Sequence, residues 1–446
     1  MRLGPWATMT SMVVVLIAIL VVSIQSGKLA TSASAWNLTY DEESSSLAVH
    51  KDRCNIPFVD EEELTLQEFV DRYWRKQPFI LQRSTHVNRP AQEWTTKQAL
   101  WQRVVSGDDA ASIPLASTQA YAFRGEKRST LVDYLSELDR KDSNNSNSSF
   151  AFGRDFLDVG RHYVPPTILS SPDAAQKLFG GIRLDDKWHY QVAIAAHGAG
   201  LPFHWHADVF AEVLHGQRRW FLYPPEHSPV FNPRATSATW LEQVYSNATF
   251  QTRNEFLMEC TLFPNQAIYV PNDWFHSTVS LGQAVSITTS FADLQRLERY
   301  QLQNGHHAYM LDALEARDFV TATQHAQALR QLRPQNFAPY AWLGVIYTLH
   351  AQTMTTADDM LALFLLARKA STECIELNPL YAPCRVWLAR QLEATSILLA
   401  SEQDGRISAD YKRQAVVMRH IAGELSSEKD DEILDPRWQP KPKTKG

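Results

Sequence analysis

The sequence has few cysteines, few glycines and no excess of positive charge. Its 446 residues include 4 Cys and 17 Gly, and 43 Lys and Arg stand against 49 Asp and Glu. The net charge of −6 gives no basis for nucleic-acid binding, because that function needs a basic surface. The length exceeds one ordinary core, so two folded domains and a targeting segment are expected.

Residues 12–24 form an almost wholly apolar run, and no charge lies between Arg2 and Lys28. This length fits the core of a signal peptide, and the wider uncharged stretch is long enough to span a bilayer. A retained single-pass type II anchor and a cleaved peptide both stay open. Either one predicts that the rest of the chain lies in the endoplasmic reticulum lumen or elsewhere in the secretory pathway. A buried helix of the globular part is the third, less favoured alternative.

Glycosylation motifs and cysteines agree with that location. Four Asn-x-Ser/Thr triplets lie in polar contexts, at Asn37, Asn144, Asn147 and Asn247. The number of cysteines is even, as in chains that form disulfides in an oxidising compartment. Cys374 and Cys384 are close in sequence and are expected to pair within one helical hairpin, with free buried thiols as the alternative.

The pattern along the chain predicts a β-rich part followed by a helical part. Short apolar segments between turn signals predict strands near 77–82, 190–196, 212–214, 219–223, 267–270 and 284–290, with helices near 64–73 and 94–105. Strands at such spacing are typical of a sandwich or barrel. The expected regions are a signal segment 1–28, a flexible stem 29–53, a β-rich domain 54–295, a helical domain 296–430 and a disordered tail 431–446.

The helical part contains a degenerate repeat. The pairs Trp342-Leu343 and Trp387-Leu388 each follow an Arg-Pro or Asn-Pro turn that opens a new helix. Tetratricopeptide (TPR) repeats have a period of about 34 residues, so an insertion is required for this interpretation. An ordinary helical domain packed on the barrel is the alternative.

Three histidines have the spacing of a metal site. His204 and His206 are two residues apart, so on a strand they would project from the same face. His276 follows on a later predicted strand, which a barrel can bring alongside the first. Imidazole suits iron, zinc, copper and nickel.

Two stretches around these histidines, 216–226 (GQRRWFLYPPE) and 268–281 (IYVPNDWFHSTVSL), resemble JmjC domains. The resemblance runs from about Cys54 to Phe291 and implies that Cys54 pairs with Cys260. It implies an all-β double-stranded β-helix, the cupin or jelly-roll barrel, with flanking helices; the C-terminal all-α, TPR-like domain lies outside it.

JmjC enzymes are typically Fe(II)- and 2-oxoglutarate-dependent dioxygenases, and the resemblance implies these two cofactors here. His204 and His276 match the two family histidines, but His206 stands where the family has a carboxylate. Arg218 stands where a lysine grips the far carboxylate of 2-oxoglutarate, and Ser290 replaces a common asparagine. Arg218, Ser290 and Tyr190 are the expected cofactor contacts.

Three interpretations of the site stay open. In the first, the three histidines bind metal with Glu212 as a fourth ligand on the same strand face. In the second, the motif shifts to His206 and Asp208 with His276. In the third, metal binding or turnover is lost and the barrel is a scaffold.

Two functions follow from these interpretations. The first is a dioxygenase that hydroxylates a protein side chain in the secretory pathway, attached to the membrane through its N-terminal segment. The second is a non-enzymatic lumenal adaptor that binds a protein partner through the barrel and the helical repeats. Nucleic acid is not an expected partner.

Overall fold

The computed structural model describes residues 35–38, 47, 50–106, 112–116, 127–140, 150–170, 173, 178, 189–233, 235–247, 255–291, 294–400 and 405–425. The predicted signal segment, most of the stem, Asn144, Asn147 and the tail lie outside these residues, and Asn37 and Asn247 are exposed. None of the helices in the described ranges is both long and apolar enough to cross a membrane.

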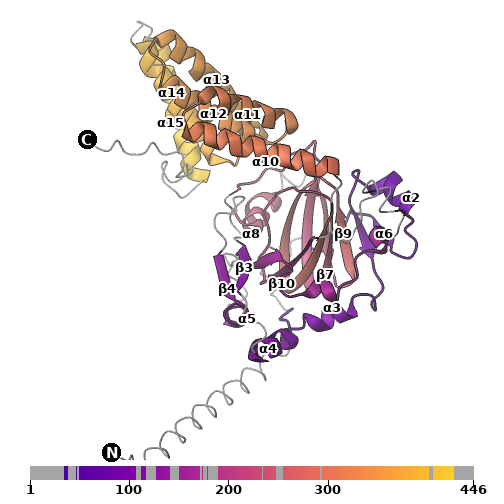
Figure 1. Cartoon of the computed structure of the whole chain (residues 1–446). Helices are drawn as coiled ribbons and strands as arrows, with labels where there is room; N and C mark the ends of the chain where they lie inside the picture. Colours follow the sequence, from indigo (N-terminus) through magenta and orange to yellow (C-terminus); the bar gives the residue numbers. More distant parts are fainter. Residues whose placement is uncertain are drawn as a thin grey trace, which may run out of the picture.

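A ten-stranded mixed sheet forms the centre of the molecule, as the predicted JmjC barrel requires (Figure 1). The strands run in the order β1-β2-β9-β7-β10-β6-β5-β3-β4, and β8 pairs with β7. Their bounds are β1 Phe58–Asp60, β2 Phe79–Gln82, β3 Ser112–Ala116, β4 Lys127–Thr130, β5 Phe150–Arg154, β6 His189–Ala195, β7 Val209–Tyr223, β8 Met258–Leu262, β9 Gln266–Val270 and β10 Phe275–Ser290.

Two long strands, β7 and β10, replace the shorter segments predicted from the sequence. They pair with each other along their whole length, with a register shift between Leu281 and Ser286. Gly216 lies at this point with a φ of 77°, and an added Cβ would come within 2.2 Å of the Gln283 carbonyl oxygen. Only glycine tolerates both conditions, so β7 bends here without ending.

The bend in β7 wraps the sheet around an apolar interior. Val209 and Val213 before the bend pack in the same buried cluster as Trp220 and Leu222 after it. Side chains alternate between the two faces of a strand, so Phe221, which lies between Trp220 and Leu222, points to the outer face. This alternation divides the side chains of β7 into one set that faces the barrel interior and another that faces the surrounding helices.

Short helices cover the outer face. Their bounds are α2 Leu66–Glu68, η2 Phe69–Tyr73, α3 Arg89–Trp94, α4 Lys97–Ser106, α5 Leu131–Arg140, η3 Val159–Arg161, α6 Thr167–Ser170, α8 Ser237–Trp240 and η5 Leu241–Tyr245. The predicted helix at 64–73 is present, and Thr65 caps it by accepting a hydrogen bond from the Glu68 amide at 3.1 Å. The predicted helix at 94–105 corresponds to α4, which begins three residues later, at Lys97, and α3, which ends at Trp94, was not predicted.

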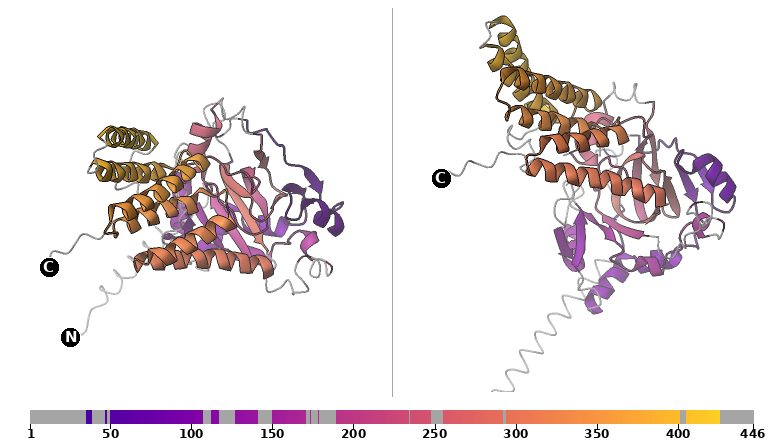
Figure 2. Two further views of the ribbon diagram at one scale, coloured as in Figure 1. Left: turned by 90° about the horizontal axis from the view of Figure 1, so that it is seen from above. Right: turned by 45° about the horizontal axis from the view of Figure 1, so that its top comes forward.

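Six helices follow the barrel and stack in sequence order beside it (Figures 1 and 2). Their bounds are α10 Leu294–Glu315, α11 Phe319–Leu332, α12 Phe337–Ala351, α13 Ala357–Leu377, α14 Ala382–Ala400 and α15 Gly405–Leu425. The two repeat motifs open α12 and α14, as expected. The assignment to the TPR class stays a prediction.

The helical region shares a core with the barrel. Phe337, Cys374 and Cys384 pack in one buried cluster with Phe203 and Phe231 of the barrel. The disulfide expected between Cys374 and Cys384 is present at this contact. The fully buried Asn378 side chain also donates a hydrogen bond of 2.7 Å to the carbonyl of Phe231. The helices are therefore fixed to the barrel by apolar packing and a buried hydrogen bond.

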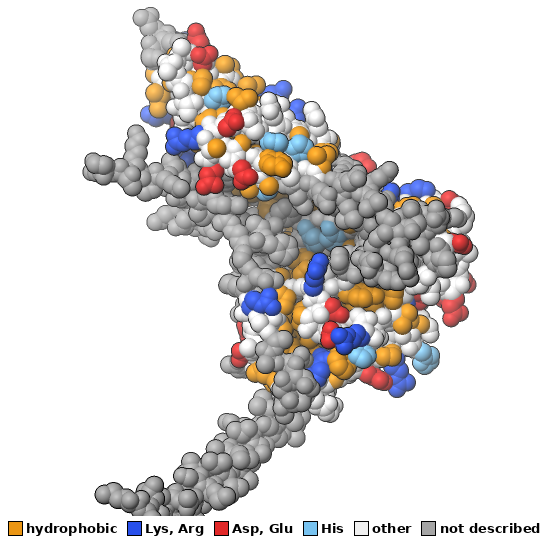
Figure 3. All heavy atoms as spheres, in the orientation of Figure 1, with side chains coloured by type: hydrophobic (Ala, Val, Ile, Leu, Met, Phe, Trp, Pro, Cys, Tyr) orange, Lys and Arg blue, Asp and Glu red, His pale blue; other side chains and the backbone are white. Residues whose placement is uncertain are grey.

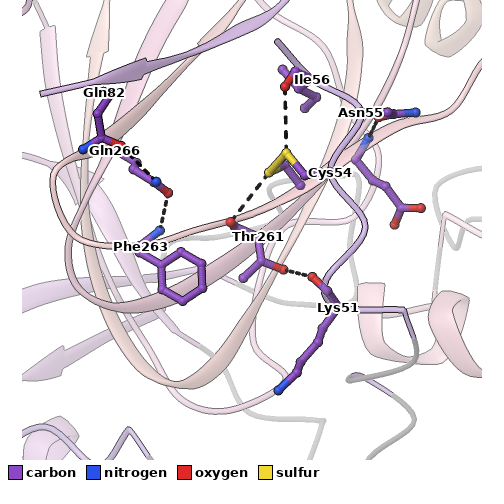
Figure 4. The surroundings of a disulfide bond; sticks show 10 residues. Lys51, Cys54, Asn55, Ile56, Gln82, Thr261, Phe263 and Gln266 are labelled. Atoms are coloured by element: carbon purple, nitrogen blue, oxygen red, sulfur yellow. Dashed lines mark hydrogen bonds between the residues drawn. A yellow bond between two sulfur atoms is a disulfide. The ribbon is translucent and has the colours of Figure 1, made fainter. Parts of the chain in front are cut away.

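The second disulfide, Cys54–Cys260, ties the segment before β1 to β8 (Figure 4). The Thr261 hydroxyl, beside Cys260, donates a 2.7 Å hydrogen bond to the carbonyl of Lys51. A half-open cavity of about 280 Å³ adjoins the bridge, and none of its lining residues is one of the three histidines. Closing a loop across 206 residues stabilises a fold by roughly 5 kcal/mol on chain entropy alone.

Candidate metal centre

The three histidines converge at one end of the barrel, but not by the strand geometry expected from their spacing. Residues 201–208 form an irregular segment before β7, and only His204 makes an isolated bridge, to His276. The His204 amide donates to the His276 carbonyl at 3.0 Å, and the reverse bond is 2.8 Å. The two ligand-bearing segments are therefore joined through their backbones.

The side chains of the three histidines form one compact group. The candidate ligand atoms of His204, His206 and His276 all lie within 4.8 Å of one another. The Nε2 atoms of His206 and His276 are 3.0 Å apart. Two nitrogens bound at about 2.1 Å to one ion, at right angles, would be separated by roughly 3 Å. The spacing therefore fits a shared ion.

Each imidazole is held in the tautomer that a metal requires. The Nδ1 atoms of His204, His206 and His276 lie 2.8, 2.7 and 3.0 Å from the carbonyl oxygens of Pro202, Ala207 and Trp274. A carbonyl only accepts, so each Nδ1 carries the proton and each Nε2 keeps its lone pair. Such backbone contacts are how proteins orient ligating histidines.

The surroundings keep the three imidazoles neutral. Burial is the largest cause, and it lowers the pKa of His204 to about 3, with the neighbouring His206 adding to the effect. Burial also lowers the pKa of His206 and takes that of His276 well below its ordinary value. Neutral nitrogens facing one another at hydrogen-bond distance repel unless a cation lies between them. The donor set thus fits a transition-metal ion.

Glu212, considered as a fourth ligand, does not join this group. It lies on the outer face of β7, where its carboxylate accepts hydrogen bonds from Arg83 at 2.7 Å, Asn88 at 2.9 Å and Tyr163 at 3.0 Å. The expected strand parity was wrong, because the chain from His204 to Asp208 is not part of the strand. Glu212 is a structural ion-pair partner of Arg83.

Asp208 also points away from the histidines. Its Oδ1 accepts hydrogen bonds from the Tyr269 hydroxyl at 2.6 Å and the Asn272 amide at 3.1 Å. Tyr269 belongs to the outer aromatic cluster, so a triad of His206, Asp208 and His276 is not assembled. Asp208 instead holds the turn that precedes His276.

Arg218 is a buried cation on the inner face, 4% exposed. It faces the same side as Ser280, its cross-strand partner. Its guanidinium donates to the hydroxyls of Ser286 at 2.8 Å and Thr278 at 3.0 Å, and its Nε has no partner. No carboxylate pairs with it among the described residues, and burial lowers its pKa to about 10. A buried cation without a counterion is costly, so this environment is suited to a bound anion.

Arg218 and the histidines share one surface inside the barrel. Thr278 follows His276 by two residues on the same face of β10, a distance of about 7 Å along a strand. The Trp220 ring lies 6.0 Å from the His276 ring, and no residue of the described ranges pairs with its buried indole nitrogen. The same holds for the Ser280 hydroxyl. These groups leave donors free for a polar ligand between the histidines and Arg218.

Sequence reasoning missed Thr278, Ser280, Ser286 and the polar role of Trp220. The alternation His276-x-Thr278-x-Ser280 on a strand was the available signal, because it places three polar side chains on the ligand-bearing face. The apolar body of Trp220 packs in the buried cluster of the barrel interior, so its indole nitrogen gives it a polar role besides packing.

The other two expected cofactor residues lie on opposite faces. Ser290 pairs with Val209, and both lie on the face of the sheet that points into the barrel. Val209 follows His206 by three residues. Tyr190 pairs with Thr289 on the outer face, where its ring lies 5.6 Å from Tyr163. Tyr190 therefore does not reach the barrel interior, and the assignment to the cofactor site was wrong.

Comparison with known proteins identifies relatives of this barrel. The profile of the JmjC domain matches residues 181–298. JmjC domain-containing protein 8 of Rattus norvegicus is 30% identical over 245 residues, which cover 54% of this chain and 83% of the relative. The Homo sapiens protein is 30% identical over 243 residues, covering 54% of this chain and 84% of its own length.

More distant relatives carry names of enzymes. The bifunctional arginine demethylase and lysyl-hydroxylase psr-1 of Caenorhabditis briggsae is 23% identical over 278 residues, covering 54% of this chain and 63% of the relative. A ribosomal oxygenase from Escherichia coli, solved with cobalt and succinic acid, covers 57% of each chain with 16% identity and a TM-score of 0.30, too low to support an argument. From the identity and coverage of the first two relatives, the chain belongs to the JmjC-domain family.

Proposed function

We propose that the protein is a non-haem Fe(II), 2-oxoglutarate-dependent oxygenase of the secretory pathway that hydroxylates a protein side chain. The observation that carries the proposal is the pairing, on one inner surface, of three neutral imidazoles with a buried arginine for which the described part of the chain provides no counterion. One group suits a metal ion and the other an anionic co-substrate.

His204, His206 and His276 would hold the iron through Nε2. Each backbone carbonyl on Nδ1 fixes the ring and makes Nε2 a better donor. When bound, iron with 2-oxoglutarate and O₂ supplies the oxidising chemistry typical of JmjC enzymes. Because His206 stands where the family has a carboxylate, the three ligands would supply no negative charge to the metal.

Arg218 would bind the far carboxylate of 2-oxoglutarate. Arginine presents a planar fork of donors that matches a carboxylate, whereas lysine is a point charge. Ser286 and Thr278 hold this fork in place. The free indole N–H of Trp220 and the Ser280 hydroxyl add donors along the path to the metal.

The proposal places the protein in the secretory pathway and gives it a protein substrate. Two disulfides among the described residues support an oxidising compartment, and the N-terminal apolar run supports entry into it, as an anchor or a cleaved peptide. The lysyl-hydroxylase in the name of the Caenorhabditis briggsae relative supports a protein substrate.

The test is metal loading followed by turnover. The purified protein is titrated anaerobically with Fe(II), its metal content is measured, and succinate release is followed after adding 2-oxoglutarate and O₂. We expect one iron per chain and succinate release that is lost in His276→Ala. A wild-type protein that retains no iron and releases no succinate would overturn the proposal, and retention of zinc without turnover would replace it with a zinc site.

The Arg218 assignment has its own control. Binding of 2-oxoglutarate to the metal-loaded protein is compared with that of 2-oxopentanoate, which has the same chain length without the far carboxylate. The wild type should prefer 2-oxoglutarate, and Arg218→Met should lose the preference. Equal binding of both acids by the wild type contradicts a carboxylate site at Arg218.

A further inference from the structure

We propose that Arg333, in the helical region, is a positioning residue for the metal centre, and this inference rests on the proposed metal site. Arg333 is the residue after α11, and its side chain is 10% exposed. It lies far from the JmjC motifs in sequence, yet it contacts both segments that carry the ligating histidines.

The first contact is with the segment that holds His204 and His206. The Arg333 guanidinium lies over the ring of Trp205, with its carbon 4.5 Å from the ring centroid. Trp205 is the residue between the two histidines. A cation over an indole face contributes about 0.5–2 kcal/mol, more when the pair is shielded from water.

The second contact is with the turn that leads into His276. Arg333 forms an ion pair with Asp273, whose side chain is 14% exposed. Asp273 has a φ of 71°, a left-handed conformation that costs energy for a residue other than glycine. Its amide donates a 3.1 Å hydrogen bond to the carbonyl of His206. The ion pair therefore stabilises a strained residue that joins the two ligand segments.

The helical region holds Arg333 firmly enough to act in this way. Its Nε donates to the Gln303 side chain of α10 at 3.3 Å. Asn378, the residue after α13, fixes a later part of the helical region to the barrel through its buried contact with Phe231. In the right-hand view of Figure 2, α10 is the helix of this region that lies beside the barrel, and α11 packs against α10. The guanidinium thus links the two ligand segments, while the Asp208 carboxylate accepts a hydrogen bond from the Asn272 amide in the turn before His276.

This arrangement gives the helical region a role at the metal site besides any partner binding. Without Arg333, the segments of His206 and His276 lose one side-chain link and keep their backbone hydrogen bonds and the contact between the Trp205 and Phe275 rings. Asp273 then keeps its strained conformation with one stabilising partner fewer. The separation of the Nε2 atoms then becomes less well defined, and the affinity for metal falls. Loss of a residue that orients ligands typically weakens metal binding by about 10–100-fold.

The test compares Arg333→Met with Arg330→Met in the full-length chain. Arg330 lies one turn earlier and covers the Tyr340 ring at 5.5 Å, so it is a matched cation–ring pair. Its contact lies within the helical region. Co²⁺ affinity is measured from the visible absorption of the bound ion, and the midpoint of thermal unfolding is measured without metal.

We expect Arg333→Met to weaken Co²⁺ binding by about 10–100-fold and Arg330→Met to leave it unchanged. Arg333→Lys should restore part of the affinity, because it keeps the charge near Asp273 but not the flat contact with Trp205. A purely structural role would lower the unfolding midpoint and leave the Co²⁺ affinity of the folded protein unchanged, which overturns the inference. A wild-type chain that binds no Co²⁺ would instead refute the proposed metal site.

Discussion

Replacing Arg218 by methionine separates a functional buried charge from a structural one. Burial lowers the pKa of Arg218 to about 10 from an ordinary value near 12.5, a difference that corresponds to roughly 3 kcal/mol against the charged form. The hydrogen bonds that the charged guanidinium donates to Ser286 and Thr278 stabilise the native state by about 3–6 kcal/mol in total. The two effects largely cancel, so Arg218→Met should lower the stability of the ligand-free protein by no more than about 3 kcal/mol.

Arg219, the next residue, is the matched control. It is fully buried, but it pairs with Glu259 at 2.8 Å and donates to the Tyr245 hydroxyl and to the carbonyl of Leu47. Removing it leaves the Glu259 carboxylate buried with one partner fewer. Arg219→Met should cost about 3–5 kcal/mol.

Urea unfolding of the metal-free variants at pH 7.5 measures both effects. The expected result is a smaller loss of stability in Arg218→Met than in Arg219→Met. Among the variants that fold, only Arg218→Met should lose binding of 2-oxoglutarate. An equal loss of stability in the two variants would refute the reasoning, because it would show that Arg218 stabilises the fold as Arg219 does.

Two further predictions concern the titration of the histidines and the role of Glu212. The pKa values of His204, His206 and His276 are lower in the folded than in the unfolded protein, so unfolding takes up protons below about pH 6.5. The free energy of unfolding of the metal-free protein should therefore fall as the pH falls towards 4, by up to about 1.4 kcal/mol per pH unit for each histidine. Thermal unfolding midpoints across this range check it, and a flat profile contradicts the neutral imidazoles. Glu212→Gln should lower stability by about 3 kcal/mol through the loss of the Arg83 ion pair, yet leave Co²⁺ affinity unchanged; a tenfold weaker affinity would return Glu212 to the ligand set.

Periodic patterns and local motifs in the sequence determined much of this protein. The His-x-His and PNDWFH segments identified the barrel and the three histidines, because their contacts are set by neighbours in the chain and by a family pattern. The two cysteine pairings were also expected, and both are present. The change from strands to helices after Asp293 follows the hydrophobic period of each segment.

Tertiary structure decided what each polar side chain faces. Glu212 and Asp208 were plausible ligands while the chain from His204 onward was treated as one strand. The irregular segment at 201–208 breaks that alternation, so both carboxylates point outward. Arg333 meets Trp205 and Asp273 across large sequence distances, and such contacts depend on how the helices pack on the barrel. Local sequence sets the side-chain period along an element, but long-range packing decides which elements face each other.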